Sequence, residues 1–151
     1  MNKKMSEQEI IDQFSTAIEN DHIYAVYQPQ INHSTGRLIG AEALMRWEHP
    51  GYGTQYPSDF IPVLENNDLI YKADLHIFEL VCRVQKKCLA DGSAIVPISF
   101  NMSRYDIYHH DYVENIEDVR RKYDIPVKYL RVEITETSAI GGMELVSDVL
   151  N

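Results

Sequence analysis

Three strand-like apolar stretches of the sequence each carry one oxygen-bearing side chain near their end. The three side chains are Glu42, Asn101 and Glu133. Two carboxylates and one amide on neighbouring strands form the kind of donor set that a hard divalent cation such as Mg²⁺ prefers. The residue types therefore predict part of a divalent-metal site. For each acid, a merely solvated position at the end of a strand is the structural alternative.

Arg46 and Gln28 could hold a ligand beside such a metal. Arg46 lies four residues after Glu42, so a regular strand turns both side chains to the same face. A guanidinium group can grip a phosphate through two parallel hydrogen bonds, although a salt bridge to a neighbouring acid is another use. Gln28 can contact a substrate or satisfy backbone groups. Arg46 beside such a metal is therefore suited to a ligand that carries a phosphate.

The first third of the chain predicts a helix followed by a hairpin. Ser6 and Glu9 form a capping box at the start of a predicted helix over residues 6–20. The alternating segment 23–31 reads as a strand. A turn-prone stretch at 32–36 separates it from the strand that carries Glu42, so the two strands predict a hairpin. A loop at 49–53 and a short helix ending near Glu65 complete this part.

The middle of the chain predicts a long helix from about Asp68 to Ala90, which ends at Gly92. Its predicted apolar stripe consists of Ile70, Ala73, Ile77, Leu80, Val84 and Cys88. The Asn101 strand is predicted over 95–103. A second helix is predicted from Asp106 or Asp111 to Tyr123, with Val113, Ile116 and Val119 on its inner face.

The last part of the chain predicts the Glu133 strand, a break at Gly141-Gly142 and a helix from Met143 to Leu150. Asn101 and Glu133 are therefore separated by strand, helix and strand, as in one parallel βαβ unit. Successive parallel strands bring their carboxyl ends to the same rim of a sheet or barrel. We expect the oxygen donors to meet at that rim.

The predicted fold class is α/β. A complete (β/α)₈ barrel takes about 250 residues, and this chain supplies about four strands. The order of elements predicts a partial TIM-like (β/α) barrel with helices on its outer face. We expect residues 1–151 to form a single, truncated domain, with a lead-in helix within 1–22 and a half barrel over 23–151.

Composition excludes several classes of protein. The formal net charge of −9 over 151 residues argues against a groove for a nucleic-acid polymer, which needs a basic face. No segment approaches the roughly 20 apolar residues of a membrane span. The charged N-terminus predicts a cytoplasmic protein. Cys82 and Cys88 lie six residues apart on a predicted helix, too far apart for a disulfide.

One further polar run has the residue types of a metal site. His109 and His110 lie between Asp106 and Asp111 at the start of the second predicted helix. We interpret this run as a solvated face.

Several blocks of the sequence, in order and at matching spacing, resemble the EAL domain family of cyclic di-GMP phosphodiesterases. The resemblance extends from about Ile23 to the last residue. Its blocks are Tyr27-Gln28-Pro29, Gly40, Glu42-Ala43-Leu44 followed by Met45-Arg46-Trp47, His49-Pro50-Gly51, Pro57 with Phe60-Ile61-Pro62, Asn101-Met102-Ser103 and Glu133-Ile134-Thr135-Glu136.

The resemblance implies a TIM-like barrel that hydrolyses cyclic di-GMP to linear pGpG at a two-metal site holding Mg²⁺ or Mn²⁺. Glu42, Asn101 and Glu133 would bind metal, and both glutamates would serve catalysis. Gln28 and Arg46 would contact the dinucleotide. Glu136 would steady the loop that carries later metal ligands.

The sequence also departs from the family pattern. An Asp-Asp-Phe-Gly motif, a later lysine and a further glutamate belong to the family site, and residues 1–151 do not include them. We therefore expect this chain alone to be inactive as a phosphodiesterase. The alternative is a cyclic di-GMP sensor or a protein-interaction module that self-associates, most simply as a dimer, through open barrel edges. Another Mg²⁺-dependent barrel enzyme, of aldolase or enolase type, would explain the acids but not Gln28 and Arg46.

Overall fold

The computed structural model describes residues 2–134 of the chain, which form helices and strands of one α/β sheet structure. The helices are α1 (Glu7–Glu19), α2 (Pro57–Asn66), α3 (Ile70–Asp91) and α4 (Tyr112–Tyr123), with short 3₁₀ turns η1 (Asp106–Tyr108) and η2 (Val127–Tyr129). The strands are β1 (Ile23–Ile31), β2 (Leu38–His49), β3 (Gly53–Gln55), β4 (Ile98–Met102) and β5 (Leu130–Ile134). The predicted helix from Met143 to Leu150 lies outside the described residues.

The lead-in helix begins where its capping box predicts. The Ser6 hydroxyl accepts a hydrogen bond from the Glu9 backbone N–H at 3.3 Å, and a Glu9 carboxylate oxygen accepts one from the Ser6 N–H at 2.8 Å. These bonds satisfy two backbone donors that a helix start otherwise leaves unpaired. Helix α1 therefore confirms the prediction to within one residue at each end.

The predicted hairpin is confirmed. Strands β1 and β2 pair antiparallel, from Ile23 opposite Trp47 to Ile31 opposite Leu38. The Asn32 side chain accepts hydrogen bonds from the backbone of the turn, and Gly36 has a φ of +65°. Asparagine and glycine are the residues that such turns favour.

The prediction of a loop at 49–53 was partly wrong. Strand β2 continues to His49, and β3 folds back on it with Gln55 opposite Trp47. Gly53 has a φ of +76°, and a Cβ there would lie 2.5 Å from Oδ1 of Asn2. A glycine therefore lets the chain reverse and return as a strand. The described sheet has five strands, one more than the sequence predicted.

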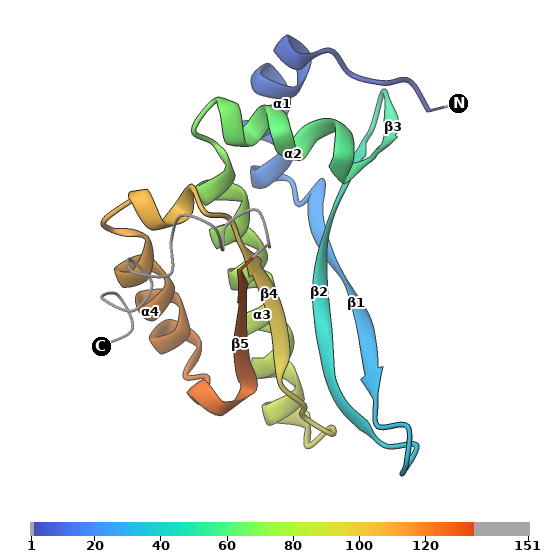
Figure 1. Ribbon diagram of the computed structural model, residues 1–151, viewed down its shortest axis with the longest axis vertical. Helices are drawn as coiled ribbons and strands as arrows, with labels where there is room; N and C mark the ends of the chain where they lie inside the picture. The colour runs from blue at the N-terminus through green and yellow to red at the C-terminus, as the bar shows by residue number, and fades with distance from the viewer. Residues whose placement is uncertain (1, 135–151) are drawn as a thin grey trace.

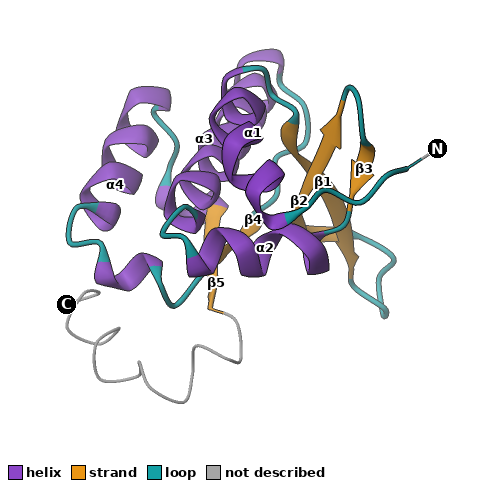
Figure 2. Ribbon diagram, turned by 90° about the horizontal axis from the view of Figure 1, so that it is seen from above, coloured by secondary structure: helices purple, strands orange, loops and turns teal. Residues whose placement is uncertain are grey.

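The sheet has the strand order β1-β2-β4-β5, with β3 on the end of β2. Strands β2, β4 and β5 run parallel, connected by crossovers through α3 and α4. Figure 1 shows α3 and α4 on one side of the sheet, with α1 and α2 over the end of the hairpin near β3 (Figures 1 and 2). This α/β arrangement agrees with the predicted strand-helix alternation and with helices on one face.

Strand β4 is shorter than the predicted 95–103. Pro97 has no backbone N–H to extend the ladder, although its carbonyl still accepts a hydrogen bond from the Ala41 N–H at 3.0 Å. The following segment forms the 3₁₀ turn η1 before α4 begins, so the later of the two predicted helix starts fits better. Ile116 and Val119 pack against the core, but Val113 is 43% exposed, which contradicts its predicted inner position.

Helix α3 extends close to its predicted bounds and ends at Gly92, whose φ of +71° is typical of a helix C-terminus. Its buried face is broader than the predicted stripe, and Val84 is 36% exposed. Phe78, Val81, Cys82 and Gln85 are buried instead, because α3 must contact α4 as well as the sheet. Cys82 and Cys88 are free thiols, as predicted, and burial raises the pKa of Cys82 to about 12.

Within the described residues, no helix is both long and apolar enough to span a membrane.

Candidate active site

The polar residues of the predicted site lie on the sheet face opposite the core. On β2 the alternate residues Ala41, Ala43 and Trp47 are buried in the core. Because side chains alternate along a strand, Glu42 and Arg46 point to the other face. Both are half-buried there. The apolar face of β2 therefore anchors the strand, while its polar face remains open to a ligand.

Glu42 lies in one row of polar side chains that crosses the sheet. Gln28 on β1 pairs with Glu42, Glu42 pairs with Ser99 on β4, and Ser99 pairs with Arg131 on β5. Paired residues share a face, and neighbouring strands are about 4.8 Å apart. The register therefore brings Gln28 next to Glu42, as the predicted site requires.

Asn101 and Glu133 form a second row on the same face. They are direct partners in the parallel pairing of β4 and β5. Asn101 is two residues beyond Ser99, so this row lies one step nearer the carboxyl ends of the strands than Glu42. Within residues 2–134, no hydrogen bond or ion pair engages the side chains of these three donors. The three predicted oxygen donors thus occupy adjacent positions with their side chains available.

A hollow of about 210 Å³ lies beside the second row, at the carboxyl ends of the strands. It is lined by Ala43, Leu44, Met45, Arg46, Pro57, Ile61, Asp74, Ile77 and Asn101. Arg46 and Asn101 are the predicted site residues that line it, whereas Gln28, Glu42 and Glu133 do not. The Arg46 guanidinium donates a hydrogen bond to the Met45 carbonyl at 2.8 Å. The hollow therefore combines an apolar wall with one cation, one amide and the acid Asp74.

The three donors have the atom type that a hard cation prefers, but they are too few to fill its coordination sphere. Glu42, Asn101 and Glu133 offer only oxygen atoms, the ligands that Mg²⁺ and Mn²⁺ prefer. Six-coordinate ions need more donors than these three side chains provide. Among the described residues, no group of three or more His, Cys, Asp or Glu side chains is placed to hold a metal ion. Glu136 lies outside the described residues.

The His-Asp run at 106–111 is the predicted solvated face only in part, at His110 and Asp111. Asp106 is fully buried. His109 lies 2.7 Å from Asp68 and stacks on the Tyr71 ring. His110 is exposed and contacts Asp111. These contacts leave no shared position for a metal, and Asp106 belongs to the interior.

Two polar residues near the site escaped the sequence analysis. Asp74 on α3 lines the hollow, and burial together with the nearby charge of Asp106 raises its pKa. An acid between the apolar positions Ala73 and Ile77 was the signal that could have revealed it. Arg131 ends the first polar row, and its position two residues before Glu133 on a strand would have placed it on the same face.

The chain matches a known domain family over most of its length. The family model described as EAL domain matches residues 11–151. The chain therefore belongs to the EAL domain family.

Two similar proteins have descriptions that name an activity. The bifunctional diguanylate cyclase/cyclic di-GMP phosphodiesterase MucR of Pseudomonas aeruginosa is 30% identical over 141 residues, covering 93% of this chain. Cyclic di-GMP phosphodiesterase RocR of the same organism is 32% identical over 123 residues, covering 82% of this chain. The chain spans only 21% and 31% of the lengths of these two relatives.

Solved structures agree with the fold. The PaMucR phosphodiesterase in complex with c-di-GMP superposes with a TM-score of 0.83 at 26% identity, over 93% of this chain and 59% of that one. The Xanthomonas citri FimX EAL domain, also in complex with c-di-GMP, has a TM-score of 0.82 at 18% identity, over 95% and 55%. The fold is thus that of the TIM-barrel-like EAL domains.

Proposed function

We propose that this chain supplies part of the active site of a metal-dependent cyclic di-GMP phosphodiesterase, which opens the cyclic dinucleotide to linear pGpG. The observation that carries the proposal is the placement of Glu42, Asn101 and Glu133 in adjacent rows on one sheet face. Membership of the EAL family supports it. So do the c-di-GMP complex and the phosphodiesterase descriptions of the relatives at about 30% identity.

In this proposal Glu42, Asn101 and Glu133 hold Mg²⁺ or Mn²⁺ together with ligands from elsewhere in the protein. When bound, such cations activate a water and neutralise charge at phosphorus during phosphodiester hydrolysis. The two carboxylates balance the positive charge of the metal, and the Asn101 amide adds a neutral donor. Glu42 and Glu133 would thereby carry the catalytic role that the sequence predicts.

Arg46 and Gln28 would hold the dinucleotide in this proposal. Arg46 lines the hollow, where its guanidinium can grip a phosphate through two bonds. Gln28 is exposed beside Glu42 and can contact the ligand through its amide. Glu136 would steady a neighbouring loop. We further propose a cytoplasmic location, which the free thiols of Cys82 and Cys88 support.

The test is to incubate the purified chain with cyclic di-GMP and Mn²⁺ or Mg²⁺. We expect metal-dependent binding of the nucleotide without turnover at an ordinary enzyme's rate, on the order of 1–10³ s⁻¹. Chelation of the metal should abolish binding. Linear product at such rates would contradict the proposed inactivity of the isolated chain, and lack of any metal-dependent binding would contradict the site itself.

A second candidate function is a protein-interaction module. Strand β5 ends the described sheet order, and near this edge Val127 and Val132 are 66% and 49% exposed. Open strand edges and apolar side chains favour association with another chain. Under this alternative the chain would form a dimer, and Val132→Lys would return it to monomer in sedimentation equilibrium. A monomer at tens of micromolar would rule the alternative out.

A further inference from the structure

The backbone N–H of Ser103, at the end of the site's central strand, donates hydrogen bonds to two carboxyl oxygens. Oδ2 of Asp106 lies 2.9 Å from this nitrogen, and Oδ2 of Asp74 lies 3.2 Å from it. Ser103 comes two residues after Asn101, directly beyond the last residue of β4. The two acids, Asp74 and Asp106, are called the acid clamp below. They hold the point where the strand leaves the sheet.

The acid clamp is buried in the interior of the protein. Asp106 is 0% exposed and Asp74 is 6% exposed. Burial raises the pKa of both carboxyl groups, and the nearby charge of Asp106 adds to the rise at Asp74. Oδ1 of Asp106 and the Tyr112 hydroxyl are buried and have no hydrogen-bond partner among the described residues. Oδ2 of Asp106 is therefore the atom that connects this acid to the turn.

The clamped turn links three elements. Asp74 belongs to α3 and Asp106 to η1. The Ser103 hydroxyl lies 3.2 Å from a carboxylate oxygen of Glu65 on α2 and accepts a hydrogen bond from the Tyr105 N–H at 3.3 Å. The backbone around Ser103 is thus held from several directions, which limits the movement of the residues just before it.

We propose that Asp106 is a positioning residue for Asn101. By accepting the hydrogen bond of the Ser103 N–H, it holds the end of β4 so that the Asn101 amide stays level with Glu133. The required property is the acceptor atom rather than a negative charge. The consequence for ligand binding rests on the proposed function, whereas the consequence for the backbone does not.

Gln85 provides a matched control at the opposite end of the same strand. It is 1% exposed, and its amide donates to the carbonyls of Val96 and Tyr129 at 2.8 and 3.1 Å. Gln85→Ala therefore removes a buried anchor of similar kind, but one that precedes β4 rather than following Asn101.

The first measurement is amide hydrogen exchange by NMR on the full chain, with the Asn101 side-chain amide recorded in the same spectra. In the parent protein the Ser103 N–H should be among the slowest to exchange within 103–111. Asp106→Ala should accelerate that exchange at least about ten-fold, as expected for a lost buried hydrogen bond, and should shift the Asn101 amide signal. Asp106→Asn keeps an acceptor and should preserve both signals. Gln85→Ala should leave both unchanged.

These outcomes decide the proposal even if Asp106→Ala does not fold. Rapid exchange of Ser103 in the parent would overturn it without any variant. Loss of protection in Asp106→Asn would overturn the claim that the acceptor matters rather than the charge. An equal response in Gln85→Ala would reduce Asp106 to a general contributor to stability.

The second measurement is calorimetric titration with cyclic di-GMP and Mn²⁺. Affinity should fall about ten-fold in Asp106→Ala, because the Asn101 amide is no longer held level with Glu133. It should stay within about two-fold in Asp106→Asn and Gln85→Ala. A parent chain that binds no nucleotide would refute the proposed function, while the exchange data would still decide the role of Asp106 at Asn101. Unchanged affinity in folded Asp106→Ala, with a binding parent, would overturn the positioning role alone.

Discussion

At the scale of single residues, the site depends on strand parity. Glu42 and Arg46 share a face of β2 because they are four positions apart. Trp47 points to the core because it is an odd number of positions from both. A shift of one residue in register would bury the acid and expose the tryptophan. The buried Trp47, which contacts Phe60 edge-to-face at 5.4 Å between ring centroids, therefore helps to orient Glu42.

Glu42→Gln should weaken metal-dependent binding of cyclic di-GMP by about ten-fold or more, because a neutral amide replaces a charged ligand of a hard cation. Glu48→Gln is the matched control. Glu48 is an exposed acid near the end of the same strand, and its carboxylate accepts a hydrogen bond from the Thr54 hydroxyl. Calorimetric titration with Mn²⁺ measures both. Equal affinities for Glu42→Gln and the parent would remove Glu42 from the site.

Arg46→Lys should reduce nucleotide affinity by roughly 1–2 kcal/mol, because an ammonium group cannot form the two-pronged contact of a guanidinium with phosphate. Arg37→Lys changes an exposed arginine just before β2 and should leave affinity unchanged. The comparison uses titrations at two salt concentrations. A loss of the same size in both variants would indicate a general charge effect instead of a specific contact.

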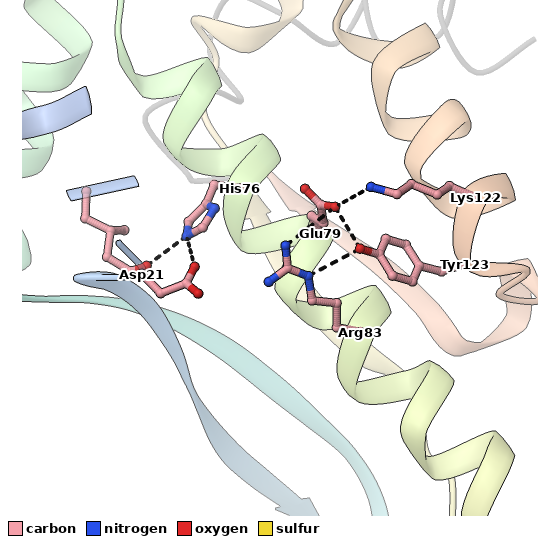
Figure 3. Close-up of polar contacts among 7 residues, drawn as sticks. Asp21, His76, Glu79, Arg83, Lys122 and Tyr123 are labelled. Carbon is pink, nitrogen blue, oxygen red and sulfur yellow. Dashed lines mark hydrogen bonds and ion pairs between the residues drawn. The ribbon is translucent and has the colours of Figure 1, made fainter. Parts of the chain in front are cut away.

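At the scale of elements, a polar network joins α3 to α4. Figure 3 shows Lys122 and Tyr123 of α4 both reaching Glu79 of α3, with Arg83 one turn further along α3. Glu79 accepts hydrogen bonds from Lys122 at 2.9 Å and from the Tyr123 hydroxyl at 2.8 Å. On the other side of α3, the buried His76 lies 2.9 Å from the Ile23 carbonyl and 3.5 Å from Asp21. These contacts fix α3 between the hairpin and α4.

Glu79 should make stability depend on pH in the acidic range. The hydrogen bond from Lys122 lowers the pKa of Glu79 below its ordinary value of 4.5. A lowered carboxyl pKa stabilises the fold above the unfolded-state pKa, and this contribution is lost as pH falls through the folded-state pKa. Thermal unfolding should therefore show that Glu79→Gln destabilises the protein at pH 7 and less so below pH 4.5.

Glu117→Gln is the control for that experiment. Among the residues that the structure describes, Glu117 pairs only with Arg120 and Arg121, inside α4. Its removal should lower the melting temperature less than Glu79→Gln at pH 7. The reverse order would show that the contacts between α3 and α4 contribute little.

At the scale of the whole molecule, one core connects helices and sheet. Phe78 of α3 and Phe100 of β4 are both fully buried, with ring centroids 4.6 Å apart. Because Phe100 points to the core, its neighbour Asn101 points to the polar face. The packing that stabilises the domain thus also orients the site.

Phe78→Ala should destabilise the protein by about 3–5 kcal/mol, since it removes a buried ring and leaves a cavity next to Phe100. Leu89→Ala on the same helix is the control, because Leu89 is 40% exposed and should cost less than about 1 kcal/mol. Urea unfolding measures both free energies. Similar costs would show that Phe78 lies outside the main core.

Local signals were sufficient for several features. The capping box located α1, the turn residues at 32–36 located the hairpin, and alternation put Glu42 and Arg46 on one face. These features involve residues that are near each other in the sequence, so propensity and periodicity describe them well. The family itself followed from motif spacing.

Longer-range contacts decided the rest. The extra strand β3 depends on the pairing of Gln55 with Trp47, and the burial of Asp106 depends on Asp74, which is 32 positions earlier in the chain. No local pattern distinguishes a solvated aspartate from one that accepts a backbone hydrogen bond in the interior. The sequence alone determined the residue types of the site and the even spacing that puts Glu42 and Arg46 on one face of their strand. Only the tertiary structure decided which of them are level with each other and what holds the strand ends, because register and burial arise from contacts between distant segments.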